Sequence, residues 1–344
     1  MQNHTTENAS ATSKSALWAV LGVAAIAAAK AIYSEITKYD LREKVVLITG
    51  GSRGLGLAMT RELGKKGCRL VICARNPEQL EKAREELAAD GIEVITIQAD
   101  LTVQNEAKNA VEAAVNRFGR LDVVINNAGV MIVGPENTMD IDDFKKVVDA
   151  NLWSALYMIK AAIPQFKKQG EGRIVNICSI GGKIAVPHML PYSVSKFAMV
   201  GLSEGIGVEL KKDNIHVTTV IPNLMRTGSP RNVSVKGDHA AEYAWFKFSA
   251  SAPLLSQNAD KAAKEIISGL QHRKSHVILT FTAKVAIALQ GIMPGTISSV
   301  MEIANRYLPD SDNKMTKTGA ESESELSQGI VAERSDEAAI KYNE

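Results

Sequence analysis

From residue 41 onward, short apolar runs alternate along the chain with longer segments of helical periodicity. The runs expected to be strands are Val45–Thr49, Arg69–Ala74, Val94–Gln98, Val123–Asn126, Arg173–Ile177, Ile215–Ile221 and His276–Leu279. Strands joined by whole helices pair in parallel through right-handed crossovers, and strands that are apolar throughout are buried on both faces. The longest helical segment, Ile141–Phe166, is expected to bend near Pro164. The sequence therefore predicts an α/β fold, a doubly wound parallel sheet of seven strands.

A glycine-rich turn, Thr49-Gly50-Gly51-Ser52-Arg53-Gly54-Leu55-Gly56, joins the first strand to the first helix. Glycines let the backbone approach a diphosphate closely, and the N-terminus of a helix supplies oriented N–H donors and a favourable dipole. Because the turn stands between a predicted strand and a predicted helix, it is typical of a dinucleotide-binding loop.

The end of the second strand bears on which nicotinamide cofactor is used. An acidic residue there would accept hydrogen bonds from the 2′-hydroxyl of NAD(H), but the chain reads Ala74-Arg75-Asn76. Arg53 and Arg75 could both reach a 2′-phosphate, which suits the guanidinium fork. The sequence favours NADP(H) over NAD(H), although either arginine taken singly could be an ordinary solvated one.

Tyr192 and Lys196 lie four residues apart, and Ser179 lies thirteen residues upstream of the tyrosine. A tyrosine has an ordinary pKa near 10, so it transfers protons poorly at neutral pH. A lysine one helical turn away stands on the same face, and its charge favours the phenolate. We therefore expect Tyr192 to exchange a proton with an alcohol oxygen near pH 7.

Together these features give the chain from about Leu41 to His276 a close resemblance to the classical short-chain dehydrogenases/reductases. The resemblance is carried by the glycine turn, Asn126-Asn127-Ala128-Gly129, Asn151, Ser179 and the Tyr192/Lys196 pair, in that order. It implies a Rossmann-fold catalytic domain over residues 41–309. It also implies an oxidoreductase that interconverts a carbonyl and an alcohol by hydride transfer.

The resemblance assigns roles to individual residues. Tyr192 would be the general acid/base, Ser179 would orient the substrate carbonyl, and Asn151 would hold a water in the proton relay. Lys196 would bind the nicotinamide ribose and lower the tyrosine pKa. Asn126 would support the sheet, and Ile221 would lie against the nicotinamide. With the glycine turn and the two arginines, the expected cofactor contacts are Gly50, Ser52, Arg53, Gly54, Leu55, Gly56, Arg75, Asp100, Leu101, Asn127, Ala128, Gly129, Tyr192, Lys196, Pro222 and Thr227.

One position departs from the family pattern. Asn223 follows Pro222 where the family usually has glycine. Asparagine tolerates a left-handed backbone better than other non-glycine residues, so we expect the turn to be retained.

The substrate is expected to be a lipophilic small molecule. Residues 225–275 contain Tyr243, Trp245, Phe246 and Phe248, which suit an apolar pocket or its packing, and Phe281–Leu308 is also largely apolar. Two alternatives remain: a 3-oxoacyl-carrier-protein-type reductase, and a non-catalytic NADP(H)-binding protein on the same fold.

The near-balanced net charge of +2 predicts no nucleic-acid partner. The resemblance implies a homo-oligomer.

The two ends of the chain differ from its centre. Within residues 1–40, a polar tail precedes an apolar run from Ala16 to Tyr33, interrupted by Lys30. This run could be a membrane anchor, a helix packed on its own protein, or a signal peptide. As an anchor it would leave the catalytic part in the cytoplasm by the positive-inside rule. Residues 310–344 are polar and are expected to be disordered.

Three cysteines without ligand spacing predict free thiols and no metal site.

Overall fold

The computed structural model describes residues 18, 21, 29, 32–252 and 256–344, and the chain divides into two units, residues 1–40 and 41–344. In the first unit, residues 32–36 are helical. Most of the apolar run from Ala16 to Tyr33 lies outside the described residues. Among the described residues, no single helix has the length and apolar character needed to cross a membrane, whereas the bent pair α10 (Phe281–Ile292) and α11 (Pro294–Asn305) meets that test by length and composition.

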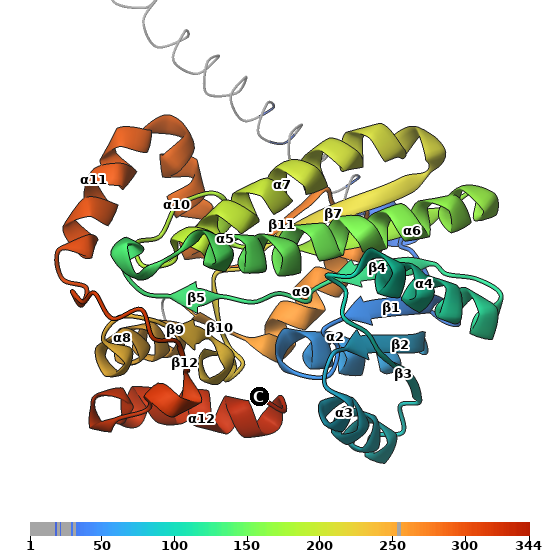
Figure 1. Ribbon diagram of the computed structural model, residues 1–344. Helices are drawn as coiled ribbons and strands as arrows, with labels where there is room; N and C mark the ends of the chain where they lie inside the picture. The colour runs from blue at the N-terminus through green and yellow to red at the C-terminus, as the bar shows by residue number, and fades with distance from the viewer. Residues whose placement is uncertain (1–17, 19–20, 22–28, 30–31, 253–255) are drawn as a thin grey trace, which may run out of the picture. The chain divides into compact units, whose positions relative to one another are not determined.

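Seven parallel strands form the central sheet of the second unit, in the order β11-β7-β6-β4-β1-β2-β3 (Figure 1). Their bounds are β1 Val45–Thr49, β2 Arg69–Ala74, β3 Val94–Gln98, β4 Val123–Asn126, β6 Gly172–Ile177, β7 Ile215–Ile221 and β11 His276–Ile278. Strands β1, β4 and β6 are buried along their whole length, as expected where helices cover both faces. The predicted doubly wound sheet of seven parallel strands is confirmed.

Helices cover both faces of this sheet (Figure 1). One face carries α4 (Gln104–Phe118), the α5–α6 segment and α7 (Leu190–Leu210). The other carries α2 (Gly54–Gly64), α3 (Pro77–Ala89) and α9 (Ala259–Gln271). A buried hydrophobic core lies between the first face and its helices. This packing fixes the carboxyl edge of the sheet, where the sequence motifs are placed.

The segment predicted as one helix extends from Ile141 to Gln169 in three consecutive parts. These are α5 (Ile141–Val148), a π-helical turn η2 (Asp149–Trp153) and α6 (Ser154–Gln169), which contains Pro164. π-helical turns are rare and often occur at functional sites. This one carries Asn151.

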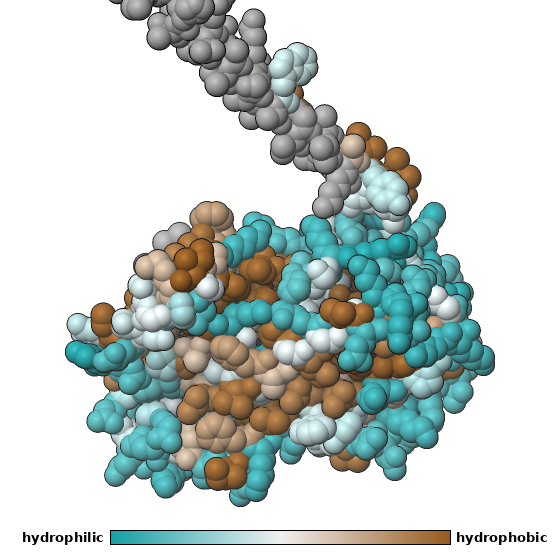
Figure 2. All heavy atoms as spheres, turned by 90° about the horizontal axis from the view of Figure 1, so that it is seen from above, coloured by the Kyte–Doolittle hydropathy of each residue, from teal (hydrophilic) through white to brown (hydrophobic). Residues whose placement is uncertain are grey.

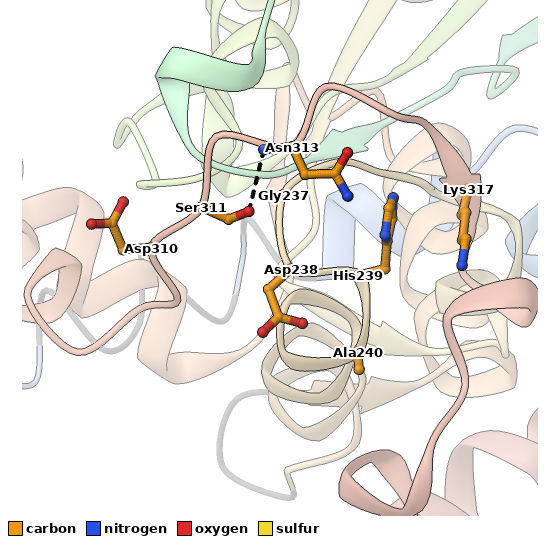
Figure 3. A pocket seen from close by; sticks show the side chains of 8 residues that line it. All are labelled: Gly237, Asp238, His239, Ala240, Asp310, Ser311, Asn313 and Lys317. Carbon is orange, nitrogen blue, oxygen red and sulfur yellow. Dashed lines mark hydrogen bonds between the residues drawn. The ribbon is translucent and has the colours of Figure 1, made fainter.

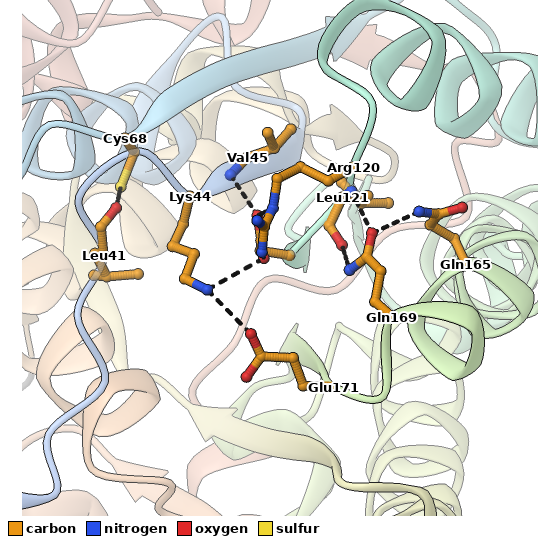
Figure 4. Close-up of polar contacts among 10 residues, drawn as sticks. Leu41, Lys44, Val45, Cys68, Arg120, Leu121, Gln165, Gln169 and Glu171 are labelled. Atoms are coloured by element: carbon orange, nitrogen blue, oxygen red, sulfur yellow. Dashed lines mark hydrogen bonds and ion pairs between the residues drawn. The ribbon is translucent and has the colours of Figure 1, made fainter.

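At the amino edge of the sheet, polar contacts join separate elements (Figure 4). Asp122, which precedes β4 and is fully buried, accepts hydrogen bonds from the Val45 N–H at 2.9 Å and from Arg120 Nε at 2.8 Å. The side chain of Gln169 bonds the Leu121 backbone in both directions, at 3.0 and 2.6 Å. These contacts hold β1, β4 and α6 together at the edge opposite the motifs.

Small elements extend the molecule beyond the carboxyl edge. Strands β5 (Ile132–Val133), β9 (Ser234–Val235) and β12 (Lys317–Thr318) form one sheet, and β8 (Leu224–Arg226) pairs with β10 (Ser256–Asn258). Helix α8 (His239–Ser251) packs against them, with Phe246 in a buried cluster that includes Val133 and Val235. These elements form a wall beside the motif residues.

The prediction that residues 310–344 are disordered is wrong. They form β12, the 3-10 turns η6 (Ala320–Ser322) and η7 (Glu325–Ser327), and helix α12 (Ile330–Lys341). The physical reason is pairing with distant residues. Lys247 of α8, only 1% exposed, pairs with Glu323 at 2.8 Å and Asp336 at 2.9 Å.

Residues 310–317 run past the start of α8 (Figure 3). The Gly237 N–H donates to the Asn313 carbonyl at 2.9 Å, and His239 Nε2 lies 2.8 Å from the Met315 carbonyl. Backbone groups of this polar segment therefore find partners in the folded domain, which its composition alone did not reveal.

Hydrophobic side chains are exposed on α7 and α10, on the side of the molecule that Figure 2 shows. They are Val194, Phe197 and Val208 on α7, and Phe281, Val285, Leu289 and Ile292 on α10. The second group belongs to the apolar segment that the sequence places after the last strand.

Candidate active site

The glycine-rich turn lies at the carboxyl edge, between β1 and α2. Gly50 and Gly54 have φ angles of +63° and +56°, which other residues rarely adopt. A Cβ on Gly56 would lie 2.0 Å from the Gly50 carbonyl oxygen, so the turn is tight enough to require glycine there. Arg53 is the N-cap residue of α2, but its side chain makes no capping hydrogen bond. The first N–H groups of this helix are therefore available to other acceptors.

Asn127 and Ala128 lie directly against this turn. Thr49 Oγ1 accepts hydrogen bonds from both of their N–H groups at 2.9 Å. Asn127 Nδ2 donates to the carbonyls of Thr49 at 3.0 Å and Gly50 at 3.1 Å. The structure thus brings together two of the sequence motifs, one after β1 and one after β4.

Ser179, Tyr192 and Lys196 also meet at this edge. Ser179 follows β6, and the other two lie in the first turns of α7. The Ser179 side chain lies close enough to the Tyr192 hydroxyl to lower its pKa. Lys196 Nζ donates to the Ile177 carbonyl at 2.9 Å and lies 5.6 Å from the centre of the Tyr192 ring.

Burial dominates the electrostatics of Tyr192 and Lys196. Burial raises the pKa of Tyr192 to about 12, and the nearby Ser179 side chain only partly offsets this. Burial lowers the pKa of Lys196 as well. The net shift is upward because desolvation disfavours the charged phenolate, and the lowering of the tyrosine pKa by Lys196 stays a prediction. Tyr192 is a neutral phenol at pH 7, the form that donates a proton.

Asn151 lies in the π-helical turn, and hydrogen bonds to its side-chain amide fix its position. Its Oδ1 accepts from the Val130 N–H at 2.7 Å, and its Nδ2 donates to the Val130 carbonyl at 3.0 Å and to Ser195 Oγ at 2.9 Å. A Cβ on Gly129 would lie 2.8 Å from Asn151 Oδ1 and 3.9 Å from Lys196 Nζ. Asn151 therefore lies beside the Gly129 backbone and Lys196.

A buried polar chain that sequence reasoning missed crosses the sheet below the site. Asn126 Nδ2 donates to Asn176 Oδ1 at 2.8 Å, and Asn176 Nδ2 donates to Ser203 Oγ at 2.9 Å. Ser203 Oγ in turn lies 2.6 Å from Thr219 Oγ1. In the sequence, this chain of hydrogen bonds could have been inferred only from the polar residues that interrupt otherwise apolar strands. The chain links β4, β6, α7 and β7, and it supports the position of Asn126 expected from the resemblance.

An apolar wall borders Tyr192. Val133, Met189, Val233, Val235 and Phe246 form its buried part, and Tyr192, Leu224 and Trp245 pack against it. Two of the four predicted aromatic residues, Trp245 and Phe246, therefore belong to it. Tyr243 is buried elsewhere, near Lys247, and Phe248 is 60% exposed.

Behind the wall lies an acidic group that the sequence did not indicate. Glu242 is fully buried; its carboxylate accepts from Trp245 Nε1 at 2.6 Å and lies 2.7 Å from His188 Nδ1. This links α8 to the segment before α7. A pocket of about 620 Å³ opens nearby, lined by residues 134–136, 185–188, 190, 305, 306 and 308–310.

The remaining predicted cofactor positions also lie along the carboxyl edge. Arg75 is exposed immediately after β2, and Leu101 is buried after β3. Asp100 Oδ1 accepts from the Thr102 N–H at 3.0 Å and from its hydroxyl at 2.8 Å. This anchors the turn after β3.

The turn after β7 takes a form other than the expected one. Asn223 does not adopt a positive φ; its side chain instead accepts the Leu224 N–H at 2.9 Å. The Pro222 carbonyl accepts from the Ile180 N–H at 2.8 Å, which ties this turn to Ser179. Thr227 is buried. A Cβ added to Gly54 would lie 3.9 Å from the Thr227 Cβ, so this residue borders the glycine turn.

Residues of the C-terminal segment lie on the glycine turn. The Gly54 N–H donates to the Tyr342 carbonyl at 2.8 Å, and Arg53 pairs with Glu344 at 3.4 Å. A nicotinamide dinucleotide fits the chemistry of the site: a glycine turn opening a helix, an arginine that binds a carboxylate, and Lys196 beside Gly129. Residues 342–344 cover the part of the turn that would hold the diphosphate.

Comparisons with known proteins agree with this geometry. The family model for short chain dehydrogenases matches residues 44–236. An uncharacterized oxidoreductase of Bacillus subtilis is 29% identical over 273 residues, covering 79% of this chain and 75% of its own. A Streptomyces coelicolor protein provisionally named a ketoacyl reductase is 35% identical over 219 residues, covering 61% of this chain and 83% of its own.

The fold is shared with solved structures. A short chain dehydrogenase/reductase from Burkholderia phymatum, solved in complex with NAD, is similar with a TM-score of 0.69 and 22% identity. The match covers 75% of this chain and 96% of that one. The chain belongs to the classical short-chain dehydrogenase/reductase family, whose fold binds a nicotinamide cofactor, and it is an oxidoreductase.

Proposed function

We propose that this protein is an NADP(H)-dependent reductase of carbonyl groups in lipophilic small molecules. The observation that carries the proposal is the Tyr192 side chain, which lies next to Ser179 and packs against the apolar wall. A carbonyl oxygen that reached both hydroxyls would be oriented by two donors, and an apolar molecule could rest against the wall.

Each residue of the site has a distinct role in such a reduction. A bound nicotinamide would supply the hydride to the carbonyl carbon. Negative charge then develops on the carbonyl oxygen, where the Ser179 and Tyr192 hydroxyls stabilise it. Tyr192 delivers the proton, because its raised pKa keeps the phenol protonated at pH 7. Lys196, fixed by the Ile177 carbonyl, keeps a donor close to the phenol.

The preference for NADP(H) rests on two arginines. Arg75 is exposed at the end of β2, where NAD(H) enzymes of this fold carry an acidic residue. Arg53 already binds a carboxylate above the glycine turn, so its guanidinium reaches an anion at this place. Both charges favour a 2′-phosphate.

A 3-oxoacyl-carrier-protein-type reductase is the second candidate. The relative from Streptomyces coelicolor that is provisionally named a ketoacyl reductase favours it. The apolar wall and the exposed apolar residues of α10 favour the lipophilic substrate instead. The two candidates differ in whether a polar carrier arm is required.

Membrane association and a cytoplasmic location are part of the same proposal. The apolar run from Ala16 to Tyr33 and the exposed face of α10 support attachment to the cytoplasmic side of a membrane. Exposed Trp153, Val194 and Phe197 support a homo-oligomer. A form lacking residues 1–40 should leave the membrane fraction if the run is the anchor.

The deciding experiment measures cofactor oxidation at 340 nm with NADPH and NADH over a panel of carbonyl compounds. The panel should include steroid, retinoid and long-chain ketones, small polar ketones and an acetoacetyl thioester. We expect turnover with NADPH and the apolar compounds. Preference for the thioester would support the second candidate, and dinucleotide binding without turnover of any compound would support a non-catalytic protein.

A further inference from the structure

The C-terminal segment ends on the turn that the cofactor needs. The Gly54 N–H, the first donor of α2, is taken by the Tyr342 carbonyl at 2.8 Å. Asn343 Nδ2 donates to the Ser52 carbonyl at 3.0 Å. Residues 342 and 343 therefore bind backbone groups of the turn itself. In this fold, the same turn and the N-terminus of the same helix receive a diphosphate.

Glu344 places a carboxyl group over the turn. Its side chain is only 5% exposed, and its Oε1 would lie 2.3 Å from a Cβ on Gly54. Its Oε2 lies 3.4 Å from Arg53 Nη1 and 2.7 Å from Asn232 Nδ2. An acidic group thus fills the space between Gly54, Arg53 and Asn232, the surroundings expected for the anionic part of a dinucleotide.

Helix α12 holds these three residues in position. Gly228 has a φ of +84°, and a Cβ there would lie 2.3 Å from Ala339 Cα, so the helix packs closely on the loop after Thr227. Lys341 Nζ pairs with Asp260 of α9 at 2.6 Å, and Arg61 of α2 donates to the Lys341 carbonyl at 2.9 Å. The contact is therefore anchored by several elements.

We propose that residues 342–344 are an internal ligand of the glycine turn, so that the C-terminal segment and the dinucleotide compete for one site. The inference rests on the proposed dinucleotide binding. A diphosphate cannot accept from the Gly54 N–H while the Tyr342 carbonyl occupies it, and it cannot share the space against Gly54 with Glu344. The segment must move before the cofactor binds.

The contacts are of a kind that can open reversibly. Lys341 and Asp260 are 54% and 40% exposed, and exposed ion pairs contribute at most about 1 kcal/mol. The apparent affinity for the cofactor is the intrinsic affinity multiplied by the fraction of molecules with an open turn. If about nine molecules in ten are closed, the apparent Kd rises about tenfold.

The test compares cofactor binding by isothermal titration calorimetry. The proteins are the full chain, a form lacking residues 329–344, and the full-chain variants Glu344→Ala and Glu337→Ala. Glu337 is an exposed residue of the same helix and serves as the matched control. With NADP⁺ as titrant, we expect Kd to fall about tenfold on truncation, to fall in part in Glu344→Ala, and to stay unchanged in Glu337→Ala.

The same titrations separate this inference from the proposed function. Equal or weaker binding by the truncated form would overturn competition while leaving dinucleotide binding intact. If no form binds NADP⁺ or NAD⁺, both the inference and the proposed function fail. If the truncated form does not fold, the Glu344→Ala and Glu337→Ala pair decides, because a Kd that is the same in both would contradict the inference.

Discussion

The catalytic residues and the C-terminal segment are both polar, yet they relate to the sequence in opposite ways. Tyr192 and Lys196 stand one helical turn apart, so their proximity follows from local geometry. Glu344 meets Arg53 across nearly the whole chain, and Asp336 meets Lys247 in another helix. A motif can be recognised from its spacing, whereas the docking of a polar segment depends on partners that only the fold supplies.

The largest expected effect tests the catalytic side of this comparison. Replacing Tyr192 by Phe removes the proton donor and leaves the ring in the apolar wall, so turnover should fall by a factor on the order of 10³. Steady-state rates with NADPH measure the loss, and calorimetry should show unchanged cofactor affinity. Tyr157→Phe, on α6, is the control and should keep its rate.

A Tyr192→Phe protein with ordinary turnover would show that another group donates the proton. Ser179 would then be the first residue to replace, since its side chain lies next to the phenol.

A smaller effect is expected at the exposed end of the cofactor site. Arg75→Ala removes a guanidinium that would pair with the 2′-phosphate, a charged hydrogen bond that contributes about 1.5–3 kcal/mol. The Kd for NADP⁺ should rise roughly tenfold to a hundredfold, and the Kd for NAD⁺ should not change. Arg84→Ala, at an exposed position of α3, is the control. Equal losses for both cofactors would contradict the assignment of Arg75.

Much of the fold could be predicted, because its signals are local. β-branched apolar runs located all seven strands of the sheet, and glycines marked the turn after β1. The predicted site residues around Tyr192 and the glycine turn meet at one edge because parallel strands end there together. The π-helical turn at Asn151 was not visible in the sequence, since it differs from an ordinary helix only in hydrogen bonds that span five residues instead of four.

The features that the sequence did not reveal have a common physical origin. The pKa prediction for Tyr192 considered only Lys196, whereas the largest cause of its raised pKa is desolvation by the surrounding fold. The Glu242–His188 pair joins residues 54 positions apart, and neither residue stands in a recognisable pattern. Residues 310–344 were judged on composition, which describes what a segment can bury alone and not what it can bind.

The docking of the C-terminal segment can be weakened at its buried cation. Lys247→Met keeps the aliphatic stem but leaves Glu323 and Asp336 without their ammonium partner. Because the two carboxylates are 31% and 44% exposed, we expect the free energy of unfolding to fall by only about 1–2 kcal/mol. Urea unfolding measures this loss, and limited proteolysis should cut within residues 310–344 sooner. Lys261→Met, at an exposed position of α9, should change neither result.

The smallest expected effect is a pH dependence of the tail contact. Burial raises the pKa of Glu344 to about 7, although Arg53 and the hydrogen bond from Asn232 act to lower it. In a released segment this carboxyl would titrate near its ordinary value of 4.5. The docked form therefore holds a proton that the released form loses between these values. Docking is strongest below about pH 4.5, weakens as the pH rises toward 7, and is constant above that.

Because docking weakens as the pH rises, the competition with the cofactor should weaken too, and a ratio of two Kd values measures this. Between pH 6 and 8, the apparent Kd of the full chain for NADP⁺, divided by that of the form lacking residues 329–344, should fall by at most about tenfold. The ratio cancels the titration of the cofactor's own phosphate, which affects both proteins equally. Glu344→Gln keeps the hydrogen-bonding shape without a titrating proton, so its ratio should be flat over the same range. A ratio that rises with pH would mean that Glu344 docks as a carboxylate paired with Arg53, and that this charge pair outweighs the burial of the acid.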